Sequence, residues 1–235
     1  MQDETFEVEF AHLTLEGYQY FIPKYALHRP AVRKFLNGSL HEPDTHRFVR
    51  GVCKSLKGSI VHAGTFFGDM LPNFSKAVSG NVYAFEPVFE NYILAKLCVD
   101  KNNLNNVILI NCALSNCFGN LKINTRQGDG RHAGGGSAIS DNGEICASIN
   151  IDRFRLEDVV LIHLDVERHE KLALSGAQET IQRCRPIIAI EDNNNNCAGF
   201  LRDIGYERSG NIHSLSIWSP NENKQYRVIV ESLIS

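Results

Sequence analysis

Residues 59–87 read SIVHAGTFFGDMLPNFSKAVSGNVYAFEP, and this stretch decides the fold that the sequence predicts. A short apolar run ends in the glycine-bearing turn 64–68, an amphipathic segment follows, and a second apolar run ends just before Glu86. The order strand, loop, helix, strand is that of one βαβ unit in a parallel sheet. Ligands of such sheets bind beyond the carboxyl ends of the strands, where we expect Gly64 and Glu86 side by side.

The two strand ends of this unit indicate a nucleoside ligand. Gly64 has no Cβ and lets the backbone approach a ligand closely, and Glu86 follows at about the 20-residue spacing expected for an acid that binds a ribose diol. Phe66 and Phe67 lie inside the turn and Asp69 follows it, whereas a pyrophosphate favours bare backbone without negative charge. The unit therefore favours S-adenosylmethionine and leaves a nicotinamide dinucleotide as the alternative.

The composition, with 43% hydrophobic and 22% charged residues, is that of an ordinary globular protein. A net charge of -3 gives no overall attraction to nucleic acid or anionic membrane, and no apolar run approaches the ~20 residues of a membrane span. The acidic first ten residues differ from a signal peptide, and the seven cysteines are scattered, as is typical of idle thiols in a reducing compartment. We expect a cytoplasmic protein without nucleic-acid or membrane partners, and homo-oligomerisation stays open.

The chain is expected to divide into an N-terminal cap, residues 1–57, and an S-adenosylmethionine-binding domain, residues 58–235. Apolar and polar residues alternate over 7–22, which predicts a β-hairpin outside the main sheet. Residues 23–43 read as irregular, and a helix is expected from about Asp44. The cap could cover the ligand or form a dimer surface.

Further apolar runs predict the rest of an α/β, Rossmann-like sheet. Buried strands are expected over 107–110, 159–164 and 186–190, and helices over 89–102 and 166–184. Two or three strand-like runs between 206 and 230 predict an antiparallel hairpin at the sheet edge. A glycine-rich loop, 126–143, lies between two more predicted strands. Its glycines indicate that it stays out of the core, as a lid or as a mobile tip.

Acidic residues follow two of the buried strands. Asp165 ends one of them and is expected to face the ligand crevice, and Glu191 ends the next. His169 adds a group that titrates near neutrality, and Glu167 lies between them. These residues could hold a magnesium ion, but we do not favour a metal because residues two apart on a helix do not share a face.

Three blocks of the sequence resemble the FkbM-type methyltransferases, a family of S-adenosylmethionine-dependent enzymes with the class I methyltransferase fold. The blocks are VHAGTFFGD at 61–69, VYAFEP at 82–87 and LIHLDVERHEKLALSGA at 161–177, supported by PIIAIE at 186–191. The resemblance implies a seven-stranded, mostly parallel sheet with an antiparallel last strand. It also implies methyl transfer to an oxygen, commonly a hydroxyl of a sugar or a related natural product.

The sequence departs from the family pattern at three positions. His62 stands where the family often has an acid, two residues before the first glycine. His163 stands where the family often has lysine, two residues before the strand-end acid, and Arg168 stands where the D-V-E-G-H-E block has glycine. The first departure leaves the contacts to the methionine end of the cofactor open, and the other two leave the acceptor open.

We interpret the sequence as that of an S-adenosylmethionine-dependent O-methyltransferase that acts on a small-molecule or glycan hydroxyl. The expected cofactor contacts are His62, Gly64, Thr65, Gly68, Glu86, Asn111, Ala113 and Asp165, with Glu86 on the ribose and Asn111 near the adenine. The candidate catalytic residues are Asp165, His169 and Glu167, and the candidate acceptor contacts are Ser137, Arg131 and Glu191. The alternatives are a non-catalytic ligand-binding or scaffold protein on the same fold and a nicotinamide-dependent oxidoreductase.

Overall fold

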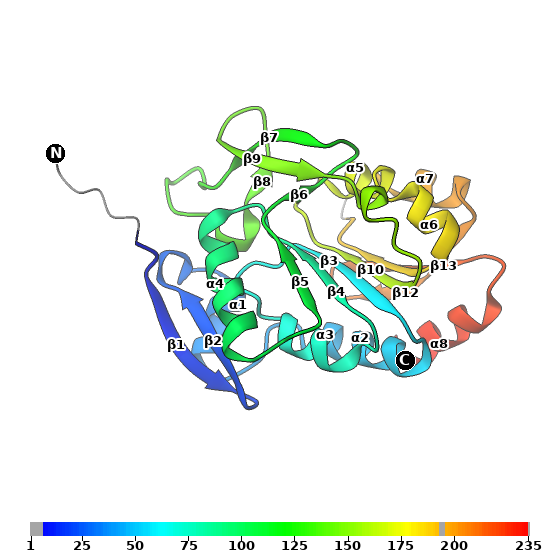
Figure 1. The fold of residues 1–235 in the computed structure, drawn as a ribbon, viewed down its shortest axis with the longest axis horizontal. Coiled ribbons are helices and arrows are strands. Elements are labelled where there is room, and N and C mark those ends of the chain that lie inside the picture. The colour runs from blue at the N-terminus through cyan, green and yellow to red at the C-terminus, as the bar shows by residue number, and fades with distance from the viewer. Residues whose placement is uncertain (1–6, 193–195, 235) are drawn as a thin grey trace.

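The computed structural model describes residues 7–192 and 196–234. A seven-stranded sheet runs through its centre in the order β12-β13-β11-β10-β3-β4-β5 (Figure 1). Its strands are β3 (Ser59–Ala63), β4 (Val82–Phe85), β5 (Val107–Ile110), β10 (Val159–Leu164), β11 (Ile187–Ile190), β12 (Tyr206–Ile212) and β13 (Leu215–Pro220). Neighbouring strands from β11 to β5 are parallel, and β13 is antiparallel to both of its neighbours. The predicted fold class and sheet are confirmed.

Helices cover both faces of this sheet (Figure 1). One face carries α2 (Pro43–Ser55), α3 (Leu71–Ala77) and α8 (Lys224–Ile234), and the other carries α5 (Glu170–Ser175), α6 (Gln178–Cys184) and α7 (Ala198–Asp203). Successive side chains of a strand point to opposite faces. Ile60 therefore packs in one core and Val61 in the other, and both are fully buried.

The N-terminal segment packs against α4 (Phe89–Lys101), which lies beside the β5 edge of the sheet. The predicted hairpin is confirmed as β1 (Phe10–Leu15) and β2 (Tyr18–Pro23). Reading the segment after it as irregular is wrong, because it contains a 3-10 turn (Lys24–Ala26) and α1 (Pro30–Leu36). Proline in the first turn of a helix costs no hydrogen bond there, and α1 buries Val32 and Phe35 against the hairpin.

A second, four-stranded sheet lies beyond the carboxyl ends of the main strands (Figure 1). Its order is β6-β9-β7-β8, from β6 (Ala113–Leu114), β7 (Gly119–Asn124), β8 (Ala138–Ile139) and β9 (Glu144–Ile149). The glycine-rich loop leaves β7 and contains the 3-10 turn Gly134–Gly136. Residues 132–134 are buried, so the expectation that this loop stays out of the core is wrong there.

Two predicted segments differ from the structure at their boundaries. The helix expected over 166–184 begins only at Glu170, because Glu167 and Arg168 take positive φ angles of 52° and 76°. It also breaks into α5 and α6 near Gly176, whose backbone is pressed against Ser115. The strand-like pattern near the end of the chain is wrong over its last part, which forms α8 and packs on α2.

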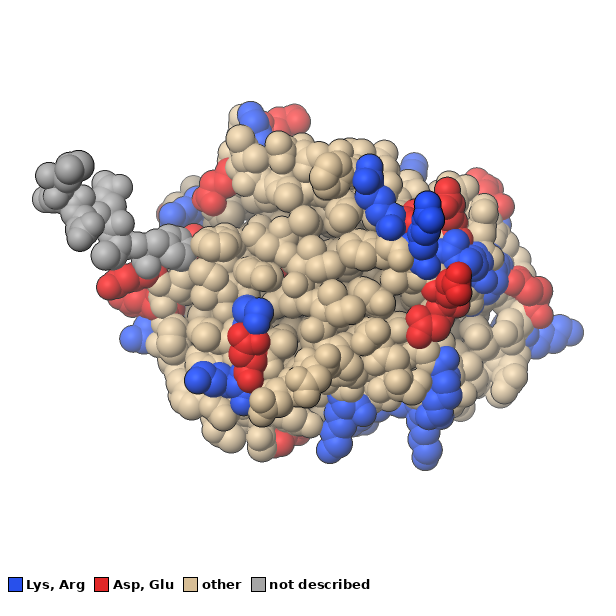
Figure 2. Space-filling view, in the orientation of Figure 1, with Lys and Arg blue, Asp and Glu red and all other residues tan. Residues whose placement is uncertain are grey.

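Charged side chains gather at the margins of the face seen in Figure 2, and the centre of that face carries few of them. The view in Figure 2 is that of Figure 1, so this nearly uncharged centre lies over β5, the edge strand of the main sheet. Ile108 of β5 is 39% exposed there.

Among the described helices, none has the length and apolar character that a membrane span requires.

Candidate active site

Two pockets open at the carboxyl ends of the central strands, and both are lined by Gly64, Gly135 and Asp165. The first pocket encloses about 480 Å³ and the second about 750 Å³, counting the space that is open to solvent. The two spaces therefore adjoin, as sites for a cofactor and for a second reactant would. Their position is where an open α/β sheet binds ligands.

Gly64 is required by the close approach of two strand ends. Its φ is +87°, and a Cβ at this position would lie 1.9 Å from the backbone oxygen of Asp165. The N–H of Asp165 donates to the carbonyl oxygen of Ala63 at 3.1 Å, which ties the end of β10 to that of β3. Any side chain at position 64 would push these ends apart and distort the boundary between the pockets.

Glu86 ends β4, is 4% exposed, and lines the first pocket. Its Oε2 accepts the N–H of Phe66 at 2.7 Å, and its Oε1 accepts the N–H of Val88 at 3.0 Å and Nδ2 of Asn91 at 3.2 Å. Burial raises the pKa of Glu86 to about 7 despite these bonds. A carboxylate has about four acceptor positions, so Glu86 keeps capacity for a ligand hydroxyl.

The rest of the first pocket is largely apolar. Apolar side chains from several elements line it, namely Phe85, Val88, Ala113, Leu114, Ile123, Ile139 and Val166. A largely apolar pocket with a carboxylate at Glu86 suits a nucleoside, with its base between apolar walls and its ribose at the acid. The residues of the first pocket thus fit the adenosine part of S-adenosylmethionine.

The glycine-rich loop closes over this pocket. Asn91 of α4 donates from Nδ2 to the carbonyl oxygen of Gly134 at 3.3 Å, and Tyr25 donates its O–H to Oδ1 of Asn91 at 2.8 Å. A Cβ on Gly135 would lie 3.1 Å from the ring of Phe66. The glycines of this turn therefore serve close packing against Phe66, and the cap, α4 and the loop meet at one place.

The three candidate catalytic residues divide between the pockets. His169 lines the first pocket, with Nε2 at 3.1 Å from Oγ of Ser115, and burial lowers its pKa. Glu167 lines the second pocket, where Arg29 lies 4.0 Å away, and burial raises its pKa. Asp165 lines both pockets. It is the candidate that a bound cofactor and a second reactant would share.

Asp165 and Glu191 form a carboxyl pair at the second pocket. Burial, followed by the hydrogen bond and the charge of Glu191, raises the pKa of Asp165 well above its usual value. Two carboxyl groups that share a hydrogen bond do not both ionise easily, and this favours a proton shared between them. A carboxylate with a pKa moved toward neutrality is suited to general base chemistry.

Several predicted cofactor contacts line neither pocket and instead support the loops. Thr65 donates from Oγ1 to the carbonyl oxygen of Phe85 at 3.1 Å, and Asn111 donates from Nδ2 to that of Glu86 at 2.8 Å. Gly68, with φ +83°, gives room to Ala95 of α4, which a Cβ there would approach to 3.1 Å. His62 is buried beside His163 beneath the site.

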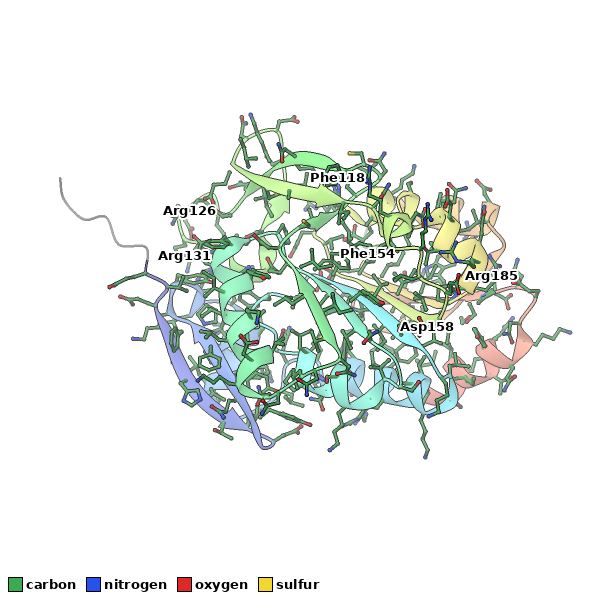
Figure 3. All side chains as sticks on the ribbon, viewed as in Figure 1. Phe118, Arg126, Arg131, Phe154, Asp158 and Arg185 are labelled. Atoms are coloured by element: carbon green, nitrogen blue, oxygen red, sulfur yellow. The ribbon has the colours of Figure 1, made fainter. Side chains whose placement is uncertain are left out.

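The predicted acceptor contacts also separate. Ser137 lines the first pocket and donates to the carbonyl oxygen of Gly134 at 2.8 Å, whereas Glu191 lines the second pocket. Arg131 is exposed at the loop tip, where its Nε donates to Asp129 at 2.7 Å. Figure 3 shows Arg131 at the outer margin of the molecule, and it lines neither pocket.

Three residues of the second pocket with a guanidinium or carboxyl side chain were not among the predicted site residues: Arg29, Glu42 and Asp69. Asp69 directly follows the glycine turn, and this position was a usable signal. Arg29 and Glu42 belong to the cap, and nothing in their spacing from Gly64 indicates that they reach the site. Within the described ranges, no group of three or more histidine, cysteine, aspartate or glutamate side chains is arranged to hold a metal ion.

Comparison with protein families identifies one match, the methyltransferase FkbM domain, over residues 62–209. No curated protein matches the sequence. The structure is similar to that of the methyltransferase FkbM from Methylobacillus flagellatus, with a TM-score of 0.51 and 16% identity over 69% of this chain and 43% of that one. The present chain thus spans less than half of that protein.

A S-adenosylmethionine-dependent methyltransferase from Aquifex aeolicus is also similar, with a TM-score of 0.43 and 17% identity over 75% of this chain and 92% of that one. At 16% identity, the match to the Methylobacillus flagellatus structure shows the fold alone. The family match covers more than half of the residues of the chain, including the strand-end acids Glu86, Asp165 and Glu191.

Proposed function

We propose that this chain, which belongs to the FkbM methyltransferase domain family and is an S-adenosylmethionine-dependent methyltransferase, methylates a hydroxyl oxygen of a sugar, glycan or related natural product. The observation that carries the proposal is the carboxyl pair of Asp165 and Glu191 at the boundary of the two pockets. A hydroxyl must lose its proton as its oxygen is methylated, so a base within hydrogen-bond reach is needed.

The first pocket is assigned to the cofactor. Glu86 would accept hydrogen bonds from the ribose, and apolar residues such as Leu114 and Ile139 would flank the adenine. When bound, S-adenosylmethionine supplies an electrophilic methyl group on a positively charged sulfur. The Gly64 turn and Asp165 lie where the first pocket meets the second, which supports placing the reacting ends of cofactor and acceptor there.

The second pocket is assigned to the acceptor. Residues of this pocket must orient the hydroxyl, exclude water and take up its proton, because an in-line displacement depends mainly on positioning. The carboxyl pair provides a proton acceptor, and its raised pKa makes it a stronger base than an ordinary carboxylate. His169 lies on the cofactor side, bonded to Ser115, and this favours a positioning role for its ring.

A turnover screen tests the proposal. The protein is incubated with S-adenosylmethionine carrying a labelled methyl group and with neutral, amino and acidic glycosides. S-adenosylhomocysteine and the methylated product are then quantified by mass spectrometry. The expected product carries the label as an alkali-stable methyl ether. A label found only on nitrogen, carbon or a carboxyl group would contradict hydroxyl methylation while leaving methyl transfer intact.

A further inference from the structure

The second pocket has an acidic lining that the transfer reaction alone does not require. Five carboxylates line it, contributed by the cap, the turn after β3 and the ends of β10 and β11: Glu42, Asp69, Asp165, Glu167 and Glu191. Arg29 is the one lysine or arginine of this lining, and it lies 4.0 Å from Glu167. The described lining therefore carries a clear excess of acidic over basic side chains.

These carboxylates act on one another across the pocket. Burial, followed by the charge of Glu42, raises the pKa of Asp69 to about 7. Glu167 and Glu42 add to the effects of burial and of Glu191 that raise the pKa of Asp165. Neighbouring carboxyl groups resist ionisation because their negative charges repel one another. A bound cation offsets this repulsion, so such a group of carboxyls binds a cation well. A bound anion would instead add to that repulsion.

His163 provides an independent indication that this pocket takes a polar ligand. Its ring is 2% exposed and lines the second pocket. Nδ1 faces His62 at 3.0 Å, while Nε2 has no hydrogen-bond partner among the described residues. A buried polar atom without a partner costs free energy, and a hydroxyl or an ordered water in the pocket would satisfy it.

The cofactor does not neutralise the lining. S-adenosylmethionine carries a sulfonium, an ammonium and a carboxylate, and so adds one net positive charge. Arg29 adds a second, and the shared proton of Asp165 and Glu191 removes one negative charge. Part of the negative charge of the five carboxylates is still without a counter-charge. A divalent metal is the less favoured counter-charge, because the described side chains offer no metal-binding group.

We propose that the second pocket selects an acceptor that carries a protonated amine close to the hydroxyl to be methylated, such as an amino sugar, and rejects acceptors with an acidic group at that place. Hydroxyl methylation is taken from the proposed function, and the amine preference specifies its substrate class. Glu42 and Asp69 face the ammonium group, and the Asp165–Glu191 pair stays available to the hydroxyl.

Binding of three methyl glycosides in the presence of S-adenosylhomocysteine tests this inference without depending on turnover. Calorimetric titration with the methyl glycosides of D-glucosamine, D-glucose and D-glucuronic acid compares a cation, a neutral polyol and an anion. The aminoglycoside should bind at least about tenfold more tightly than the neutral one, and the glucuronide most weakly. Titration in buffers of different ionisation enthalpy should show proton release, because a cation favours ionised Asp69.

A pair of variants assigns the preference to the pocket. Glu42→Gln should reduce the preference for the aminoglycoside severalfold, while the exposed Glu179→Gln on α6 should leave it unchanged. Equal affinities, tighter binding of the glucuronide or no binding of any glycoside would overturn the inference. Glycoside binding that requires magnesium and is lost on addition of EDTA would also overturn it, because the carboxylates would then bind a metal ion. Methylation of nitrogen with the preference intact would instead contradict the proposed function.

Discussion

The Nδ1 atoms of His62 and His163 lie 3.0 Å apart, on the neighbouring strands β3 and β10. One ring must donate and the other accept at this distance, so the accepting imidazole is neutral, and burial lowers the pKa of both rings. The resembling family often has an acid and a lysine at these two positions. The chain departs from that pattern at both positions, so a hydrogen-bonded histidine pair stands beneath the active site in place of an acidic and a basic side chain.

Charging one member of this pair should destabilise the protein, and charging both should restore part of the loss. His163→Lys alone places an ammonium group in a fully buried site, at a cost of about 3–5 kcal/mol. The double variant His62→Asp, His163→Lys should recover at least half of that loss. Denaturant unfolding of the parent, both single variants and the double variant completes the cycle.

The exposed His213→Lys variant controls for the substitution itself, because His213 is already paired with Asp44 at the surface, at 3.1 Å. It should change the free energy of unfolding by less than about 0.5 kcal/mol. A double variant no more stable than His163→Lys would show that the two positions are not coupled.

The same pair should make stability depend on pH. Burial lowers the pKa of His163 to about 4 and that of His62 well below its usual value. In the unfolded chain, the two histidines take up protons near pH ~6.5. Their contribution to the free energy of unfolding is therefore complete above that pH and is lost as the pH falls from about 6.5 toward 4. Each histidine should lower the free energy of unfolding by up to about 1.4 kcal/mol per pH unit in that window.

Asp69 and Glu86 act in the opposite sense, because their raised pKa values, about 7, make the folded state take up protons as the pH falls below 7. The difference in the free energy of unfolding between the parent and His163→Gln isolates the contribution of His163. Denaturant unfolding at several pH values from 7.5 to 4.5 should show a smaller loss of stability in the variant. Parallel curves would mean that His163 does not titrate with unfolding.

The sequence predicts the main sheet well for a physical reason. Both faces of its strands are covered, so the strands read as short apolar runs, and acids such as Glu86 and Asp165 mark where two of them end. Local sequence patterns do not predict the second pocket or the turn that precedes α5. The second pocket needs Arg29 and Glu42, which arrive through tertiary packing of the cap, and the turn at Glu167 depends on a positive φ that no local rule predicts for glutamate.

Glu86 should control cofactor affinity. Glu86→Gln keeps the shape but donates where the carboxylate accepted, and it disturbs the bonds from Phe66 and Val88. Loss of hydrogen bonds to a charged group corresponds to about 1.5–3 kcal/mol, or about 10–100-fold weaker binding of S-adenosylhomocysteine in calorimetry. Asp100→Asn, on the exposed side of α4, is the control. Unchanged affinity in Glu86→Gln would place the ribose elsewhere.

The packing of the glycine-rich loop gives a matched pair of substitutions. Gly135→Ala brings a methyl group to 3.1 Å from the ring of Phe66, whereas Gly128→Ala meets nothing within 4 Å. The first should loosen the loop and the second should not. Limited proteolysis, with and without S-adenosylhomocysteine, should show faster cleavage near residue 130 in Gly135→Ala. Equal cleavage of both variants would mean that the contact with Phe66 does not hold the loop.

Asp165 lines both pockets, whereas His169 lines only the first, and this difference gives the most direct test of mechanism. If the Asp165–Glu191 pair takes the proton, Asp165→Asn should lower turnover by about 10²–10⁴-fold, the effect of losing a general base. Turnover of the parent should rise with pH through the raised pKa of the pair, because only the ionised form accepts a proton. This limb should be absent in Asp165→Asn.

His169→Gln provides the contrast, since its ring lies in the first pocket and is bonded to Ser115. It should weaken binding of S-adenosylhomocysteine and lower turnover less, and the pH limb should survive. Circular dichroism and thermal melting verify that both variants fold. If the limb vanishes in His169→Gln and persists in Asp165→Asn, the histidine is the base. The acceptor hydroxyl would then have to reach across the shared boundary at Gly64 into the first pocket.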